Sequence, residues 1–170
     1  MKMILATENE SKEAAELYSL CKKELLKKDI YQWDDNYPNE EFVKDWIEDK
    51  ELYLAVEEEE IIGAVVLNEY ESDEWGSVQW GNEDGNDLIV HALCVHPYQQ
   101  GKGIGKELVQ HSENIATEKG YSSIRLDAFS GNEHALKLYE SMGYIKRGEV
   151  HFQSKPEGHQ CYYCFDKILE

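Results

Sequence analysis

The sequence predicts an α/β (α+β) protein built on a central mixed sheet. Leu88 to Val95 is a run of apolar and β-branched residues without Gly or Pro, which is typical of a buried strand. A glycine-rich stretch follows, and apolar residues then recur at helical spacing from Ile104. The chain of 170 residues contains no linker or repeat, so we expect a single domain over residues 1–170.

The first part of the chain predicts a strand, two helices and a hairpin. Thr7 offers a helix N-cap, and Ala14, Leu17, Tyr18 and Cys21 form one apolar stripe after it. Two strand-like runs are separated by acidic residues that suit a solvated turn. The expected elements are a strand at 3–6, helices at about 10–28 and 39–50, and strands at 51–57 and 61–68.

The segment between the two helices combines aromatic and acidic side chains, and it has two interpretations. Aromatic faces and carboxylates both attract ammonium groups, so the segment could line a pocket for a cationic acceptor. It could equally hold the two helices together with its acids in water. The residues concerned are Tyr31, Trp33, Asp34, Asp35 and Tyr37.

Residues 69–87 are too long for an ordinary connection and carry Trp75 and Trp80. A long loop with large aromatic residues beside a ligand-bearing strand is a candidate lid, and a structural flap packed on the sheet is the alternative. Ser77 to Trp80 could add an edge strand.

The last third predicts a strand, a helix and a closing pair of strands. Gly120 ends the helix that starts at Ile104. Ser130 and Glu133 form a capping-box pattern, so the next helix should start near Gly131 and stop at Gly143. The three strands are expected at 123–128, 144–150 and 162–168, with the last two antiparallel.

The glycine-rich stretch from Gln100 to Lys106 has the properties of a phosphate site. Glycines let the backbone approach a ligand closely, and the first N–H groups of a helix favour an anion. Residues 88–106 contain no Asp or Glu and carry Lys102 and Lys106, although the chain has 35 acidic and 17 basic residues. The glycine spacing fits neither the dinucleotide-binding pattern nor the nucleoside-triphosphate loop.

Two blocks resemble the GNAT family of N-acetyltransferases. Residues 100–105, QGKGIG, are similar to the family's Gln/Arg-x-x-Gly-x-Gly/Ala signature for the pyrophosphate of acetyl-coenzyme A. Residues 132–144, NEHALKLYESMGY, are similar to its N-x-x-A-x-x-L-Y-x-x-x-G-[FY] pattern. The resemblance covers roughly residues 52–169, and Gln100 stands where many members have Arg.

The resemblance implies a GNAT-like fold, with a central mixed, mostly antiparallel sheet of six to seven strands flanked by about four helices. It also implies cofactor-binding residues. Main-chain groups of Leu93, Cys94 and Val95 would hold the pantetheine arm, and Asn132 would bond to it. The pyrophosphate would be received by Gln100, Gly101, Lys102, Gly103, Ile104, Gly105 and Lys106.

The implied reaction is direct attack by a primary amine on the acetyl carbonyl of acetyl-CoA, the co-substrate. A backbone N–H of the central strand would polarise the carbonyl. In the family the residue matching Tyr139 lies near the thioester sulfur, where its phenol can protonate the departing thiolate. An acyl intermediate on Cys94 is not expected, because the sequence around it offers no activating group.

The general base stays open among four residues near the acceptor end of the central strand: Asp87, His91, Glu69 and Glu83. The acceptor is an unidentified small-molecule or peptide amine. Two rival functions remain, a catalytically silent acetyl-CoA sensor or scaffold and an acyltransferase that uses another acyl-CoA. A homodimer is compatible with the sequence, which does not determine the oligomeric state.

The composition of the chain excludes some classes of binding partner and indicates the cellular compartment. The formal charge of −18 argues against nucleic acid or an anionic membrane as a partner. No apolar run reaches the roughly 18 residues of a membrane span, and a cytoplasmic protein is expected. The pair Cys161 and Cys164 is weak evidence for a metal, so no metal site is predicted.

Overall fold

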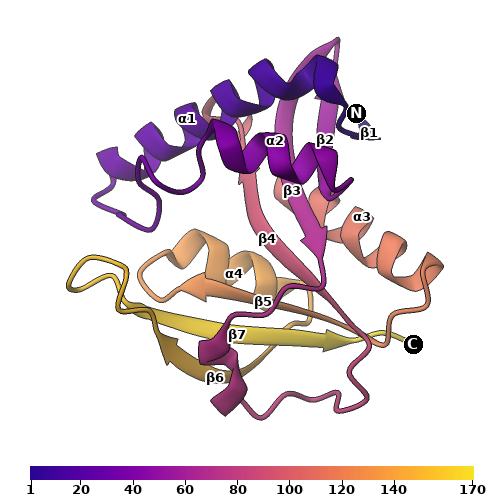
Figure 1. Cartoon of the computed structure of the whole chain (residues 1–170), viewed down its shortest axis with the longest axis vertical. Coiled ribbons are helices and arrows are strands. Elements are labelled where there is room, and N and C mark those ends of the chain that lie inside the picture. The colour runs from indigo at the N-terminus through magenta and orange to yellow at the C-terminus, as the bar shows by residue number, and fades with distance from the viewer. The chain divides into compact units, whose positions relative to one another are not determined.

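The computed structural model describes residues 1–170 (Figure 1). The strands are β1 (Lys2–Leu5), β2 (Leu52–Glu57), β3 (Glu60–Asn68), β4 (Asp87–Val95), β5 (Ser123–Phe129), β6 (Ile145–His151) and β7 (Cys161–Ile168). The α-helices are α1 (Ser11–Lys27), α2 (Glu40–Glu48), α3 (Ile104–Glu118) and α4 (Glu133–Ser141). Short 3-10 helices are η1 (Glu8–Glu10), η2 (Asp73–Ser77) and η3 (Pro97–Gln99).

The seven strands form one sheet in the order β1-β2-β3-β4-β5-β7-β6. Strand β4 pairs with β5 in parallel, with Asp87 opposite Ser123. The pairs β1–β2, β2–β3, β5–β7 and β6–β7 are antiparallel. The predicted α/β class, the mixed, mostly antiparallel sheet and the four flanking helices are therefore confirmed.

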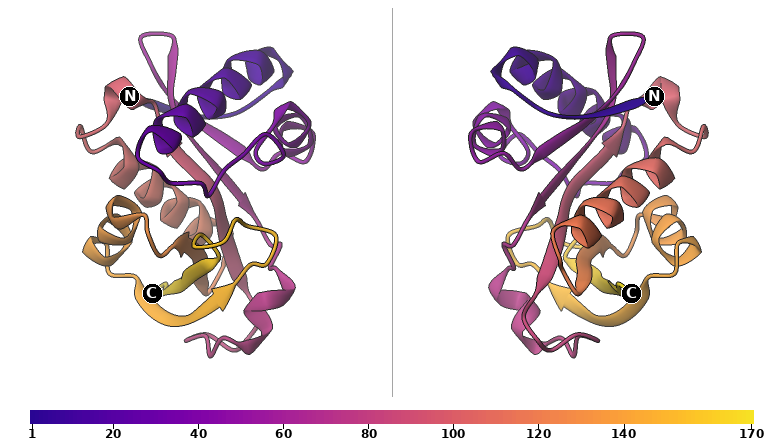
Figure 2. Two further views of the ribbon diagram at one scale, coloured as in Figure 1. Left: turned by 90° about the vertical axis from the view of Figure 1, so that its left-hand side faces the viewer. Right: turned by 90° about the vertical axis from the view of Figure 1, so that its right-hand side faces the viewer.

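The chain divides into two compact units, and β4 and α3 each contribute to both. The first unit comprises residues 1–67 and 91–111. Within it, α1 packs against α2 (Figures 1 and 2). Their apolar stripes form one cluster with the β2–β3 hairpin, and its buried members include Leu17, Tyr18, Val43, Leu54 and Val66. The amphipathic spacing of α1 therefore buries the residues that the sequence predicted.

The second unit comprises residues 68–90 and 112–170 and holds η2, β5, α4, β6 and β7. Glu113 links α3 to β7 and to the start of β6. Its carboxylate accepts hydrogen bonds from the Tyr144 hydroxyl at 3.1 Å and from Lys167 Nζ at 2.8 Å. Lys167 Nζ also donates to the Met142 carbonyl at 2.9 Å. This partly buried network fixes the C-terminal end of α4 against β7.

Two local predictions are wrong. Ser77 to Trp80 forms no edge strand, because Ser77 is the last residue of η2 and the chain bends at Val78. Helix α4 is capped by Asn132, whose side-chain oxygen accepts from the amide of Ala135 at 3.2 Å, and it begins at Glu133. The capping box predicted at Ser130 is therefore not the N-cap.

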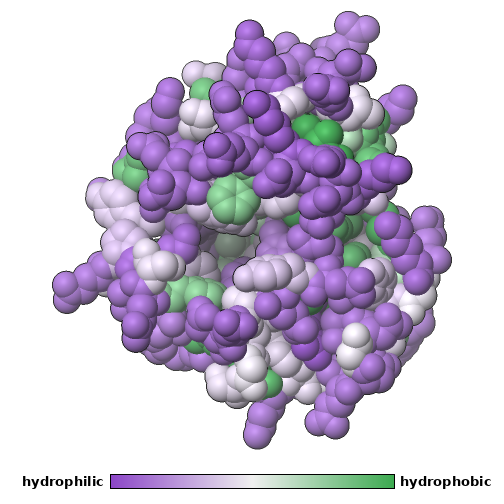
Figure 3. Space-filling view, viewed as in Figure 1, coloured by the Kyte–Doolittle hydropathy of each residue, from purple (hydrophilic) through white to green (hydrophobic).

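The visible surface is mostly polar. On the face shown in Figure 3, hydrophilic residues predominate and hydrophobic ones are scattered among them. No helix is both long enough and apolar enough to cross a membrane.

Candidate active site

The glycine-rich loop has a backbone that only glycine adopts readily. Gly101 and Gly103 have φ of +82° and +80°, and a Cβ added to either would meet no protein atom within 4 Å. Ile104 begins α3 and is buried, which anchors the end of the loop. The loop is therefore shaped by left-handed turns with open space beside them.

The amide groups of residues 101–106 donate no hydrogen bond within the protein. The first main-chain bond of the helix start runs from Glu107 N to the Gly103 carbonyl at 3.1 Å. Lys102 Nζ lies 3.1 Å from the side-chain oxygen of Gln99, and the Lys106 side chain is exposed. Donor groups and two positive charges are thus available to an anion at this helix start.

The predicted pantetheine segment lies at the end of β4. Ala92, just before it, has a φ of +49°, which is rare for a residue with a side chain. Burial raises the pKa of the Cys94 thiol well above its usual range, and a hydrogen bond with Cys21 raises it further. A thiol that stays protonated is a poor nucleophile, which agrees with the prediction that Cys94 forms no acyl intermediate.

Asp127, a half-buried carboxyl on β5, was not among the residues predicted for the site. Burial raises the pKa of Asp127 to about 6. The Trp75 indole Nε1 donates to the carboxylate at 2.9 Å and opposes this rise, as does the charge of Lys155, while Glu74 adds to it. A carboxyl with this pKa can exchange protons near neutral pH.

Tyr139 of α4 lies close enough to Asp127 for the carboxylate charge to influence its pKa. Its ring is buried, 5.9 Å from the Tyr144 ring and 6.3 Å from the Phe165 ring between centroids. Burial and then the charge of Asp127 raise its pKa, so the phenol remains protonated at neutral pH. Cys164 faces Asp127 across the β5–β7 pair, and burial together with that charge raises its pKa to about 12.

The four carboxylate and imidazole candidates for the base have different surroundings. Asp87 is buried and engaged: it accepts hydrogen bonds from the Ser123 hydroxyl and from Asn82 Nδ2, and it lies 3.2 Å from an Arg125 nitrogen. Glu69 and Glu83 are exposed, and His91 is half-buried. The Asp87 carboxylate is therefore occupied by contacts that stabilise the fold.

The long segment before β4 lies on the sheet as a flap. The Trp75 and Trp80 rings lie 4.9 Å apart, and the Arg125 guanidinium lies 4.6 Å from the Trp80 ring centroid. Gly81 N also donates to the buried carboxylate of Asp166 at 2.7 Å. Because Trp75 is buried and bonded to Asp127, the flap interpretation of this segment agrees with the structure.

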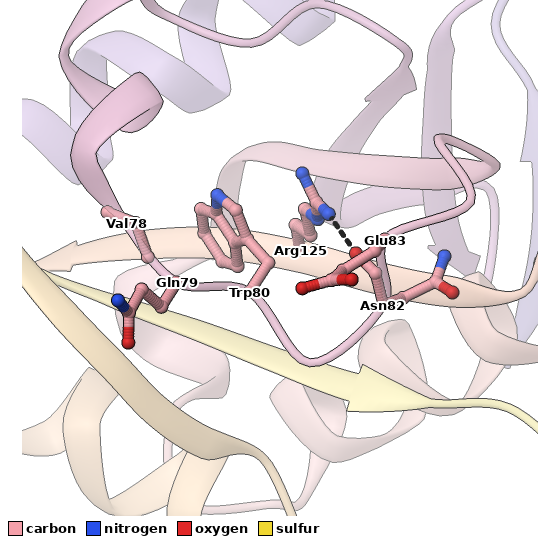
Figure 4. Close-up of a pocket in the computed structure, with 6 residues that line it drawn as sticks. All are labelled: Val78, Gln79, Trp80, Asn82, Glu83 and Arg125. Atoms are coloured by element: carbon pink, nitrogen blue, oxygen red, sulfur yellow. Dashed lines mark hydrogen bonds between the residues drawn. The ribbon is translucent and has the colours of Figure 1, made fainter.

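Figure 4 shows an open pocket beside this flap, lined by Val78, Gln79, Trp80, Asn82, Glu83 and Arg125. The Arg125 guanidinium donates to the Asn82 carbonyl and to Glu71, both at 2.6 Å. Glu71 and Asp87 already neutralise this arginine. The pocket therefore offers no net positive charge to a ligand.

The aromatic segment between α1 and α2 serves packing. Trp33 is buried in the core cluster and Tyr37 packs on it. The Tyr37 ring lies 4.9 Å from Phe42 and 6.1 Å from Trp46 between centroids. The two aspartates that follow Trp33 are exposed. These contacts favour the interpretation in which the segment holds two helices together.

Comparison with known proteins adds independent evidence. Over 59 residues, the chain is 30% identical to the thialysine N-epsilon-acetyltransferase of Bos taurus, an alignment that covers 35% of either protein. The chain thus spans about a third of the length of that curated relative.

Solved structures show the same fold. An acetyltransferase of the GNAT family from Streptococcus agalactiae superposes with a TM-score of 0.85 at 18% identity, covering 99% of this chain and 95% of that one. The yncA protein of Salmonella typhimurium, solved with its cofactor acetyl-CoA, gives a TM-score of 0.74 at 17% identity, covering 99% and 94%.

The model of the acetyltransferase (GNAT) family matches residues 4–144, which is most of the chain. Together with the glycine loop and the common fold, this match shows that the protein belongs to the GNAT acetyltransferase family.

Proposed function

We propose that this protein transfers the acetyl group of acetyl-CoA to a primary amine of a small molecule or peptide, by direct attack and in the cytoplasm. The observation that carries the proposal is the glycine loop, where the amides of residues 101–106 donate no bond within the protein. Those amides, with Lys102 and Lys106, suit a pyrophosphate. The same residues lie in the only long stretch free of acids in a chain with a charge of −18.

The remaining cofactor contacts follow from the family. Main-chain groups of Leu93, Cys94 and Val95 hold the pantetheine arm, and Asn132 bonds to it. The side-chain oxygen of Asn132 also caps α4, which restricts the orientation of its amide group. The whole of residues 1–170 is proposed to act as one acetyltransferase domain.

Two residues of the second unit are proposed to move the protons. Asp127 replaces the four earlier candidates as the base, because it is half-buried, has a pKa of about 6 and can exchange its proton near neutral pH. It accepts the proton from the attacking amine. Tyr139, protonated at neutral pH, donates to the departing thiolate as the tetrahedral oxyanion collapses to amide and thiol.

The acidic surroundings favour a cationic acceptor. Asp127 and the exposed Glu74 both attract an ammonium group, and Glu74 is close enough to influence the Asp127 pKa. The thialysine enzyme acts, by its name, on an amine, which agrees with this acceptor class. A panel of L-lysine, spermidine and an alanine-terminated peptide, tested by thiol release from acetyl-CoA, checks the function.

The panel also separates the rivals. Acetyl-CoA binding without turnover of any amine would favour the silent sensor. Faster turnover with succinyl-CoA than with acetyl-CoA would favour another acyl donor.

Lys102→Glu is expected to weaken acetyl-CoA binding about 10-fold at low salt and less at high salt, since ions screen an exposed charge. Calorimetry at two salt concentrations measures this. Lys44→Glu, an equally exposed change on α2, is the control and should leave the affinity unchanged. Equal affinities for the two variants at both salt concentrations would contradict the phosphate loop.

Tyr139→Phe is expected to lower kcat by about 10²-fold while the acetyl-CoA Kd stays within about twofold, because only the proton donor is removed. Steady-state kinetics and calorimetry separate the two effects. The ring keeps its packing against Tyr144 and Phe165. An unchanged kcat would remove Tyr139 from the mechanism.

A further inference from the structure

The backbone of β4 is strained at Ala92. Its φ of +49° lies in the left-handed region, although the residue carries a Cβ. Such a conformation persists only where the surrounding structure holds it. The strained residue directly precedes Leu93, the first of the three residues proposed to bind the pantetheine arm.

A buried tyrosine of α1 holds this residue. The Tyr18 hydroxyl donates to the Ala92 carbonyl at 2.8 Å. Its ring is 1% exposed and lies 5.8 Å from the Trp33 ring and 5.7 Å from the Trp46 ring between centroids. The ring that carries the hydroxyl is thus held by two tryptophans of the same core cluster.

A second bond fixes the other end of the same segment. The Cys21 thiol, one helical turn after Tyr18, donates to the Val95 carbonyl at 3.3 Å. The two donors and the two acceptors are each three residues apart. Helix α1 therefore holds the β4 main chain on both sides of Leu93 and Cys94.

The held carbonyl determines the direction of the next amide. In a trans peptide the C=O and the following N–H point in opposite directions from one rigid plane. With the Ala92 carbonyl directed at Tyr18, the Leu93 N–H points away from that hydroxyl. A fixed N–H is what an acyl carbonyl needs when negative charge develops on its oxygen.

We propose that Tyr18 is a positioning residue of the acetyl transfer: its hydroxyl fixes the Ala92–Leu93 peptide so that the Leu93 N–H is aimed at the thioester carbonyl. The inference rests on the proposed function. Tyr18 touches neither substrate, and it acts only through the orientation of this peptide. The contact joins residues 74 positions apart, which no local pattern predicts.

Tyr18→Phe tests the proposal, because it removes the hydroxyl and keeps the ring between its two tryptophans. With acetyl-CoA and the best amine of the panel, kcat should fall about 10-fold or more as the peptide loses its fixed orientation. The acetyl-CoA Kd should stay within about twofold, since the phosphate loop is unchanged.

The control is Val43→Ala, which opens a cavity in the same core cluster at α2 and keeps both the Tyr18 hydroxyl and the Ala92 carbonyl. It should lower the unfolding temperature and leave kcat unchanged. An unchanged kcat in Tyr18→Phe would overturn the inference, as would an equal kcat loss in Val43→Ala. Absence of turnover in the wild-type protein would instead overturn the proposed function, and the inference with it.

Discussion

Gly103→Val is expected to abolish acetyl-CoA binding and to leave the fold in place. Gly103 has a φ of +80°, which a β-branched residue does not tolerate, so the loop must change its backbone. No protein atom lies within 4 Å of the added Cβ, so the new side chain occupies space outside the packed protein. Loss of two charge-assisted amide bonds to phosphate would weaken binding at least about 100-fold.

Calorimetry with acetyl-CoA measures this loss, and Gly85→Val is the matched control. Gly85 has a φ of +76° and equally open surroundings, but it lies in the segment before β4. Both variants should lose similar stability through backbone strain, and only Gly103→Val should lose affinity. If Gly103→Val bound acetyl-CoA as tightly as Gly85→Val does, the loop would not be the phosphate site.

The sequence predicted the elements whose residues repeat along one face. Apolar spacing located α1 and α3, and the run of apolar and β-branched residues without Gly or Pro located β4 to within one residue. Glycine spacing located the loop, because a left-handed turn at a helix start leaves a local pattern. These features depend on residues within a few positions of one another.

The sequence did not reveal features that depend on distant contacts. The predicted edge strand at Ser77 to Trp80 does not form, and Trp75, just before it, is bonded to Asp127, 52 residues away. Ser130 and Asn132 are both suitable caps, and the local pattern did not distinguish them. An acid in the centre of the apolar strand SIRLDAF was the available signal for Asp127, but its burial becomes visible only when β7 and the flap are in place.

Asp127→Asn is expected to lower activity by 10²-fold or more while making the protein more stable at neutral pH. The change removes the proposed base, and an amide oxygen can still accept from the Trp75 indole. In the wild-type protein kcat/KM should fall as the pH drops through about 6, the Asp127 pKa, because the protonated carboxyl cannot act as a base. We call this part of the pH profile the acidic limb. That limb should be absent from whatever activity the variant retains.

The stability effect follows from the same pKa. Because folding raises it, protonation of Asp127 stabilises the fold at low pH, and this contribution is lost as the pH rises through about 6. The loss amounts to at most about 3 kcal/mol. Urea unfolding at pH 5 and pH 8 should therefore show an advantage of Asp127→Asn over the wild type that grows with pH.

Two neighbouring variants test the assignment of the limb without removing the carboxyl. Glu74→Gln takes away a negative charge that raises the Asp127 pKa, so the limb should move to lower pH. Lys155→Met takes away a positive charge that lowers it, so the limb should move to higher pH. Opposite shifts in the kcat/KM profiles would identify Asp127 as the titrating group, because a base elsewhere would not respond to this pair. A limb that stayed in place in both variants would contradict the assignment, and so would an Asp127→Asn protein that kept full activity.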